Sequence, residues 1–255
     1  MPGVQVVAAR LLVAVATYNE IESLPGLVDE IFRYAPTADL LIVDDNSPDG
    51  TGCWCDARAA SDRRVHCLHR PGKLGLGTAT LAALRYAVEQ DYDYVVNMDA
   101  DFSHQPRDIP RLVSGMTANR EGPVDVVIGS RYVPGGAIEG WSAWRHLMSR
   151  AVNLYSRWML GLTCRDCSGA FRCYRTEQLK RLDFGAFRSH GYAVLEELLW
   201  HLQTMGCRFA ETPIIFTNRR QGRSKINSRE AVAALWTILC LGMRSRWRCR
   251  WSNAG

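Results

Sequence analysis

The stretch Asn97-Met98-Asp99-Ala100-Asp101, which follows the apolar residues Tyr94-Val95-Val96, decides the fold of this chain. Because side chains alternate along a strand, the carboxylates of Asp99 and Asp101 point to the same side of the strand end. Two like charges held so close raise the proton affinity of one carboxylate unless a cation lies beside them. Oxygen ligands suit Mg²⁺ or Mn²⁺, which complete their coordination shells with water and substrate phosphates. The pair predicts a divalent metal site, and the alternative is an ordinary solvated turn.

A second acidic pair, Asp44 and Asp45, closes another apolar run and is followed by a cluster of turn-forming residues. Apolar runs predict strands, and helical spacing predicts helices, in this order: strand 11–16, helix 21–34, strands 40–43 and 65–68, helix 78–90, strands 94–98 and 124–128. Such alternation predicts an α/β fold with a mostly parallel sheet flanked by helices. Ligands bind these sheets beyond the carboxyl ends of the strands, where we expect Glu20, Asp45 and Asp99 to gather.

Composition and charge fit an enzyme with one large domain, which we place at residues 1–225. The chain has 255 residues, of which 47% are hydrophobic, and a formal net charge of +5. Residues 217–255 contain nine Lys or Arg and one acidic residue, so the remaining residues sum to −3. No interleaved aromatic platform or helix-turn-helix pattern accompanies this basic segment, which argues against nucleic acid. An anionic phosphate or a membrane surface is the better partner.

The nine cysteines are odd in number, so they cannot all pair within one chain. Cys164 and Cys167 have zinc-hook spacing, with Cys173 nearby, but a second hook and suitably spaced histidines are missing. We therefore expect most cysteines to be small buried apolar residues in a reducing compartment.

A glycine-rich loop at residues 71–78 precedes the helix at 78–90 and contains Lys73. Its spacing matches neither a Walker loop nor a dinucleotide-binding fingerprint. It is either a flexible turn with a helix cap or a loop that faces phosphate. Few lysines occur in a chain that otherwise uses arginine, and this favours a functional Lys73.

Six motifs occur in this order along the chain: Ala16-Thr17-Tyr18-Asn19-Glu20, Val43-Asp44-Asp45-Asn46-Ser47-Pro48-Asp49-Gly50-Thr51, the 72–78 loop, Met98-Asp99-Ala100-Asp101-Phe102-Ser103-His104, Gly129-Ser130-Arg131-Tyr132 and Gly222-Arg223-Ser224-Lys225. In this order they resemble the polyprenyl-phosphate mannose synthases, also called dolichol-phosphate mannosyltransferases, which are inverting glycosyltransferases of family 2 with a GT-A fold. The resemblance extends from about residue 11 to about residue 240.

This resemblance implies GDP-mannose as donor, a polyprenyl phosphate lipid as acceptor and Mg²⁺ or Mn²⁺ as cofactor. It implies donor contacts from Ala16, Tyr18, Glu20, Val43, Asp45, Ala100, Arg131, Arg219, Arg223 and Lys225. Asp99 and Asp101 would bind the metal, and these two with Arg131 would be the catalytic residues. Two positions depart from the pattern: Ala16 stands where many relatives have proline, and Ser103 where some have a metal-binding glutamine, so a water could replace the third metal ligand.

The acceptor phosphate is already an anion at neutral pH, since its second pKa is about 6, so the reaction needs no general base. It needs cations, and we expect Arg131, Arg145 and Ser149 to hold the acceptor, although Arg145 also fits an exposed position on an amphipathic helix. The helix at 191–205 contains Glu196 and Glu197. We interpret it as a helix that packs on the core, and the alternative is that it supplies a catalytic acid. Alternative functions are a glucosyl or other hexosyl transferase, a non-catalytic nucleotide-sugar-binding protein and a nucleotidyltransferase.

The C-terminal residues 226–255 predict how the chain meets its lipid. Residues 231–243 carry no charge, and thirteen residues span only about 20 Å of helix, too short for a bilayer core of about 30 Å. The four arginines and two tryptophans at 244–251 suit a membrane interface. We expect an amphipathic interfacial helix with a basic tail, which would hold the protein peripherally on the cytosolic face of a membrane. A small membrane-protein subunit is a further expected partner. The alternative is a helix that docks on the core and a disordered tail.

Overall fold

The structure is a computed structural model that describes residues 9–118, 122–189, 191–218 and 234–243. A seven-stranded sheet with the order β3-β2-β1-β4-β7-β5-β8 forms its centre. The strands of this sheet are β1 (Leu11–Thr17), β2 (Asp39–Asp44), β3 (Val65–His69), β4 (Tyr94–Asp99), β5 (Val126–Ser130), β7 (Arg172–Arg175) and β8 (Phe209–Pro213). A smaller sheet pairs β6 (Ala137–Glu139) with β9 (Ile215–Thr217) in parallel.

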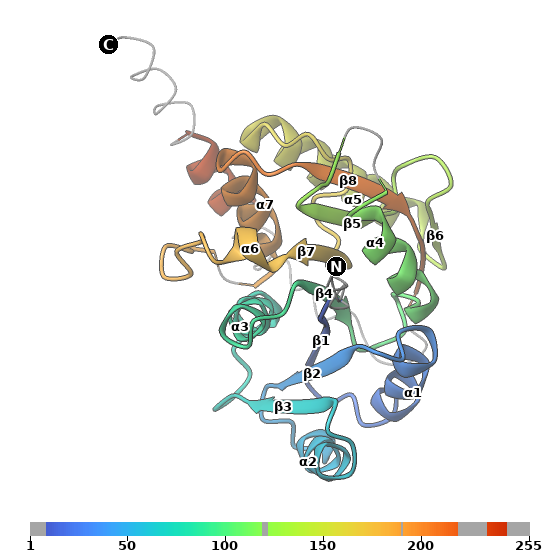
Figure 1. Cartoon of the computed structure of the whole chain (residues 1–255). Coiled ribbons are helices and arrows are strands. Elements are labelled where there is room, and N and C mark those ends of the chain that lie inside the picture. The colour runs from blue at the N-terminus through green and yellow to red at the C-terminus, as the bar shows by residue number, and fades with distance from the viewer. Residues whose placement is uncertain (1–8, 119–121, 190, 219–233, 244–255) are drawn as a thin grey trace, which may run out of the picture.

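Helices cover both faces of the central sheet, as Figure 1 shows, with α1 and α4 on one side and α3, α6 and α7 on the other. The helices are α1 (Leu24–Tyr34), α2 (Thr51–Ser61), α3 (Leu76–Glu89), α4 (Ile109–Gly115), α5 (Ala143–Leu160), α6 (Thr176–Leu179) and α7 (Val194–Thr204), with short 3-10 turns η1 (Pro106–Asp108) and η2 (Gly191–Ala193). This arrangement confirms the predicted α/β fold with flanking helices.

The apolar run in β1 is continuous because each face of the sheet has its own core. Leu12 and Ala14 pack in the cluster that contains residues of α3 and α7. Val13 and Val15 pack in the opposite cluster with residues of α1 and α4. Parallel strands buried on both faces have this pattern, whereas a strand with one solvated face alternates between apolar and polar residues.

The five predicted strands all form, with small differences at their ends, but four further strands, β6, β7, β8 and β9, were not predicted. β7 lies between β4 and β5 and runs antiparallel to both, so the sheet is mostly rather than wholly parallel. The predicted helix at 21–34 begins later, at Leu24, because Pro25 occupies its first turn, where a missing N–H costs little.

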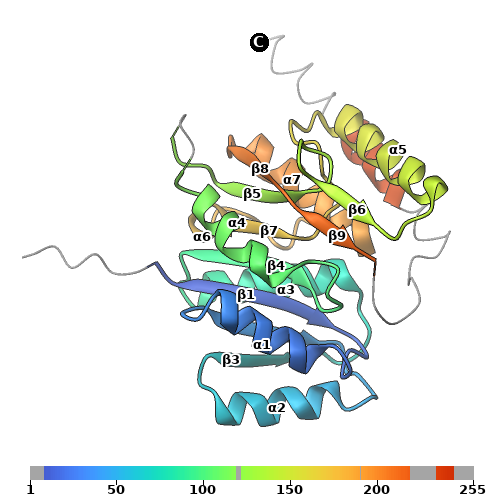
Figure 2. The ribbon, with the colours of Figure 1, turned by 90° about the vertical axis from the view of Figure 1, so that its right-hand side faces the viewer.

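Helix α5 lies beside the helix formed by residues 234–243, as Figure 2 shows. Ile238 and Leu241 are buried at this contact. Gly242 allows the close approach, because a Cβ there would lie 2.6 Å from the carbonyl oxygen of Met159. These contacts are those of a helix docked on the core. The predicted domain boundary at 225 and the basic tail at 244–255 lie outside the described residues.

Among the helices that the structure describes, none has the length and apolar character needed to cross a bilayer. The described cysteines are free, and Cys55, Cys164, Cys167, Cys173 and Cys207 are buried, as predicted for most of them. Burial raises the pKa of the Cys164 thiol to about 12, so this cysteine is a neutral thiol at neutral pH.

Candidate active site

A tight turn after β4 presents the acidic pair. Asp99 is the last residue of β4, and Asp101 is buried directly after it. Phe102 has a φ of 61°, a left-handed conformation that costs energy for a residue with a side chain, and such strain is often found at functional sites. The Ser103 N–H donates to Asp101 Oδ1 at 3.0 Å. The Ser103 side chain is fully buried and its Oγ has no hydrogen-bond partner, so the acidic turn contains an unpaired oxygen ligand.

His104 belongs to the same turn and is not among the predicted site residues. Its Nδ1 accepts a hydrogen bond from the Asp99 N–H at 3.1 Å, which places the ring proton on Nε2 when the imidazole is neutral. Burial lowers the pKa of His104, although Asp99 and Asp101 oppose the shift. The ring stacks on Phe171 with centroids 5.0 Å apart. The position of a histidine three residues after the second aspartate of the acidic pair could have indicated a role for His104 in the site.

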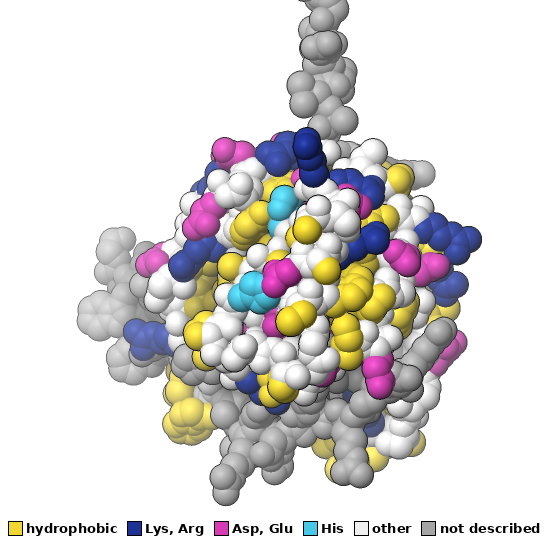
Figure 3. Space-filling model, turned by 90° about the horizontal axis from the view of Figure 1, so that it is seen from below, with side chains coloured by type: hydrophobic (Ala, Val, Ile, Leu, Met, Phe, Trp, Pro, Cys, Tyr) yellow, Lys and Arg dark blue, Asp and Glu magenta, His cyan; other side chains and the backbone are white. Residues whose placement is uncertain are grey.

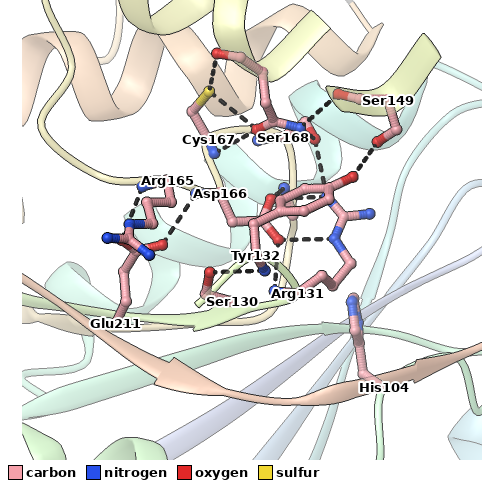
Figure 4. Close-up of polar contacts among 12 residues, drawn as sticks. His104, Ser130, Arg131, Tyr132, Ser149, Arg165, Asp166, Cys167, Ser168 and Glu211 are labelled. Carbon is pink, nitrogen blue, oxygen red and sulfur yellow. Dashed lines mark hydrogen bonds and ion pairs between the residues drawn. The ribbon is translucent and has the colours of Figure 1, made fainter. Parts of the chain in front are cut away.

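Arg131 and Asp166 form a buried ion pair, shown in Figure 4. Arg131 Nε and one terminal nitrogen each donate to Asp166 at 2.7 Å, and the Arg131 backbone N–H donates to the same carboxylate at 3.0 Å. Burial opposes the charge on Arg131, but Asp166 outweighs this effect and raises the pKa of the guanidinium. Arg131 therefore stays cationic in a position fixed by two parallel bonds. Sequence reasoning missed Asp166 as the residue that fixes it.

The loop that carries Asp166 is attached to α5. Asn153 of α5 accepts from the Cys167 N–H at 2.8 Å and donates to Ser168 Oγ at 3.0 Å. Ser168 Oγ in turn accepts from Arg131 at 2.9 Å. These contacts join α5 to the arginine that follows β5, so a movement of the helix would disturb the ion pair.

A cavity of about 470 Å³ connects these elements. Asp99, Asp101 and Arg131 line one part of it, which we call the polar end, and Met148, Leu235 and other apolar residues of α5 and the 234–243 helix line the part that we call the apolar end. Six predicted site residues line the cavity together: Asp99, Asp101, Ser103, Arg131, Arg145 and Ser149. Arg145 lies over the Trp141 ring at 4.0 Å, and Ser149 Oγ lies 2.6 Å from the Tyr132 hydroxyl.

Glu196 of α7 also lines the cavity, and its Oε2 is buried without a hydrogen-bond partner. Burial raises the pKa of Glu196 to about 7, against the opposing charge of Arg172. Its neighbour Glu197 instead accepts hydrogen bonds from the backbone N–H groups of Arg188 and Ser189. The nearby His201 side chain and these bonds lower the pKa of Glu197 despite burial. The two acids of α7 are therefore in opposite electrostatic environments.

The remaining predicted donor residues lie at the ends of β1 and β2, next to the acidic turn. Ala16 is in register with Val43 on one side and with Asp99 on the other. The glycine-rich loop lies over these ends because Asp45 Oδ2 accepts from the Leu74 N–H at 3.0 Å. Its other oxygen accepts from Arg70.

Lys73 on the glycine-rich loop reaches the Tyr18 ring, with Nζ 4.6 Å from the ring centroid. Glu20 Oε2 accepts from Ser23 Oγ at 3.2 Å, and Ala100 is buried in the acidic turn. Asp45 thus holds the loop in place, and its predicted nucleoside contact stays a prediction. Arg219, Arg223 and Lys225 lie outside the described residues.

A mostly parallel sheet whose strand ends carry this acidic turn belongs to the GT-A class, and comparisons with known proteins agree. Residues 12–183 match the model of the family described as "Glycosyl transferase family 2". An undecaprenyl-phosphate mannosyltransferase of Micrococcus luteus is 42% identical over 93% of this chain and 96% of its own length. A polyprenol monophosphomannose synthase of Mycolicibacterium smegmatis is 40% identical over 93% of this chain and 88% of its own.

Solved structures share the fold at lower identity. A glucosyl-3-phosphoglycerate synthase of Mycobacterium tuberculosis, bound to Mn²⁺, UDP and glucosyl-3-phosphoglycerate, superposes with a TM-score of 0.62 at 19% identity over 93% of this chain and 80% of its own. A mannosyltransferase of Pyrobaculum calidifontis in complex with GDP-mannose and Mn²⁺ gives 0.60 at 21% identity over 86% of this chain and 59% of its own. The predicted GT-A fold is confirmed. The chain belongs to glycosyltransferase family 2.

Proposed function

We propose that this chain transfers mannose from GDP-mannose to a polyprenyl monophosphate, with inversion at the anomeric carbon. Both bacterial relatives are named for mannosyl transfer to polyprenyl phosphates, and their similarity covers almost the whole chain. The observation that carries the proposal is the mixed lining of one cavity. Its carboxylates and buried arginine suit a diphosphate and a sugar, and its apolar side chains suit the first isoprene units of a lipid.

A divalent cation, Mg²⁺ or Mn²⁺, fits the residues of the acidic turn. Asp99, Asp101 and Ser103 would hold it, since they offer hard oxygen ligands and the Ser103 Oγ is otherwise an unpaired buried oxygen. Such an ion would neutralise charge on the departing diphosphate. The mannosyltransferase neighbour with GDP-mannose and Mn²⁺ supports this cofactor.

The protein's own residues position the reacting groups. An oxygen of the acceptor phosphate forms a bond to the anomeric carbon while the bond from that carbon to the GDP oxygen breaks, and GDP leaves with the electron pair. No proton needs to be removed from the acceptor phosphate, because it is anionic at neutral pH. Arg131, fixed by Asp166, stabilises negative charge in the cavity without having to reorganise. Arg145 and Ser149, on the α5 side, hold the acceptor phosphate in line.

We place the membrane against the outer face of α5. Trp144, Leu147, Leu154 and Trp158 of α5 and Trp236 of the neighbouring helix are each more than half exposed. An exposed apolar face with tryptophans is typical of membrane interfaces. Because the other face of α5 lines the cavity, a lipid acceptor reaches the apolar end of the cavity directly from the bilayer. A small membrane-protein subunit that covers this same face is the alternative.

A transfer assay tests the proposed function. The purified chain is mixed with undecaprenyl phosphate in detergent micelles, Mn²⁺, and radiolabelled GDP-mannose or UDP-glucose in parallel. We expect lipid-linked mannose from GDP-mannose and loss of the product after treatment with EDTA. Preferential use of UDP-glucose would identify a glucosyl transferase, and tight GDP-mannose binding without any product would identify a binding protein; either result overturns the proposal.

A further inference from the structure

Three side chains with metal-binding atoms meet at the far edge of the sheet from the apolar face of α5. Asp56 lies on α2, and Cys67 and His69 lie on the edge strand β3. Their ligand atoms lie within 4.8 Å of one another. None of the three lines the cavity or belongs to the acidic turn after β4. Figure 3, which views the molecule from the α2 side of Figure 1, shows histidine and acidic side chains next to each other at the open surface.

Two of the three ligand atoms, Asp56 Oδ1 and Cys67 Sγ, approach the third, which is His69 Nε2. His69 Nε2 lies 2.8 Å from Asp56 Oδ1 and 3.3 Å from Cys67 Sγ. One N–H points at only one acceptor, so a proton on Nε2 cannot serve both the carboxylate and the sulfur well. A cation between the three atoms would satisfy all of them at once.

The observed distances are close to those of a tetrahedral zinc site. Bond lengths of about 2.0–2.1 Å to nitrogen or oxygen and about 2.3 Å to sulfur place tetrahedral ligands roughly 3.3–3.5 Å apart. The His69–Asp56 and His69–Cys67 atom pairs would therefore have to separate by only a few tenths of an ångström, and the remaining pair lies within 4.8 Å. His69 and Asp56 are accessible enough to adjust, since their side chains are 46% and 62% exposed.

Neighbouring residues already orient the group. Cys55 of α2 is fully buried next to the Cys67 side chain. Gly52 in the first turn of α2 lets the His69 ring approach, because a Cβ there would lie 3.3 Å from the ring. Such outer contacts orient metal ligands.

The donor set selects the metal. Sulfur and imidazole nitrogen are poor ligands for Mg²⁺ and Mn²⁺ but good ones for Zn²⁺, and a thiolate with a carboxylate balances the charge of the ion. We propose that Asp56, Cys67 and His69 bind one Zn²⁺, with water as the fourth ligand, and that this ion joins α2 to the edge strand β3. The site is separate from the proposed catalytic metal in position and in ligand chemistry.

The experiment uses Co²⁺ as a spectroscopic substitute for Zn²⁺ on the full-length, reduced, metal-free protein. We expect a thiolate-to-cobalt absorption band that saturates at one equivalent and disappears when Zn²⁺ is added. Cys67→Ser and His69→Ala should abolish the band. Cys53→Ser, which changes an exposed cysteine on α2 outside the cluster, should retain it. Asp101→Ala should also retain it, which separates this site from the acidic turn.

Thermal unfolding provides a second measurement that does not depend on colour. Saturating Zn²⁺ should raise the Tm of the wild-type protein and of Asp101→Ala by about 5 °C, because a ligand that binds only the folded state stabilises it. The Tm of Cys67→Ser should not respond. A cobalt band that survives in Cys67→Ser, or a wild-type protein that takes up no Co²⁺ or Zn²⁺ at one equivalent, overturns the proposal.

Discussion

The polar end of the cavity and the apolar face of α5 are neighbours, but they are stabilised in opposite ways. Around Arg131 the side chains are buried and joined by short hydrogen bonds before any ligand binds. On the outer face of α5, in contrast, Leu154 and Trp158 are about two-thirds exposed. The polar end is preorganised for charge, which is how enzymes stabilise a transition state. The apolar face gains its stabilisation only when a partner covers it.

The largest effect should come from the acidic turn at the polar end. Asp101→Ala removes a proposed metal ligand and should reduce transfer at least about 10³-fold, comparable to the loss of a major electrostatic contact. Metal-dependent stabilisation by GDP in thermal unfolding should also be lost. Asp29→Ala, which removes an exposed carboxylate of α1, is the control and should transfer normally. Normal turnover and metal dependence in Asp101→Ala would disprove the metal assignment.

The next effect concerns the stability of the polar end. Asp166→Asn leaves Arg131 buried without its charge partner, and breaking a buried pair costs about 3–5 kcal/mol of unfolding free energy. Chemical denaturation measures this loss. The matched control is Asp29→Asn in the exposed pair with Arg58, which should cost less than about 1 kcal/mol. Equal losses in the two variants would show that the Arg131–Asp166 pair does not fix the polar end.

Much of the polar end could be predicted because its residues are close in sequence. Strand β4, its acidic turn and the metal candidates lie within ten residues, and apolar runs ending in acids are typical of buried parallel strands. The same reasoning failed for β7, whose residue Arg172 is fully buried. That arginine is buried because the carbonyl oxygens of Cys167 and Leu195 accept its N–H groups. No periodicity in the sequence encodes those partners.

Contacts between distant segments were also beyond the sequence. Asp166 pairs with a residue 35 positions earlier in the chain. The docking of the 234–243 helix on α5 depends on Gly242 meeting Met159, a contact that becomes visible only once both helices are in place. The motifs identified the strand ends, whereas the cavity arises from segments that folding brings together.

Glu196 and Glu197 of α7 should make the stability of the protein depend on pH in opposite ways. Glu196 has its pKa raised from 4.5 to about 7 by burial, so it stays protonated between these values while the unfolded chain is ionised. Its contribution to stability is therefore full below pH 4.5 and is lost as the pH rises toward 7. Glu196→Gln should remove this loss. Relative to the wild type, the unfolding free energy of the variant should be higher at pH 8 than at pH 4.5 by on the order of 1–3 kcal/mol.

Glu197→Gln is the control for that measurement and should respond in the opposite sense. Hydrogen bonds lower the pKa of Glu197 against the effect of burial, so its stabilisation is present above pH 4.5 and is lost as the pH falls through the lowered pKa. The destabilisation of Glu197→Gln relative to the wild type should therefore be largest at neutral pH.

Transfer by Glu196→Gln should stay within about tenfold of wild type, a change of about 1.4 kcal/mol in the activation free energy, because the reaction requires no general base. A loss of transfer beyond about 10³-fold would make Glu196 a general base.

The apolar face should show a smaller effect, confined to membrane binding. Leu154→Ser with Trp158→Ser should weaken co-sedimentation with anionic liposomes by about 10–100-fold, since partial burial of the two side chains together is worth roughly 1.5–3 kcal/mol. Leu74→Ser, which changes an exposed leucine on the glycine-rich loop, should bind liposomes normally. Use of a short, water-soluble isoprenyl phosphate should be unchanged. Equal binding by all variants would mean that a membrane subunit or another surface makes the contact.

The smallest effect should come from Arg145, where the two regions meet. Its guanidinium lies over Trp141 at 4.0 Å and lines the cavity from the α5 side, so it is placed to meet the acceptor phosphate rather than the donor. One partly exposed cation contributes about 1–2 kcal/mol, so Arg145→Ala should raise the KM for polyprenyl phosphate about tenfold. The KM for GDP-mannose and kcat should change little. Arg150→Ala, on the same helix but exposed, is the control. A change in the donor KM alone would move Arg145 to the nucleotide side and separate acceptor binding from α5.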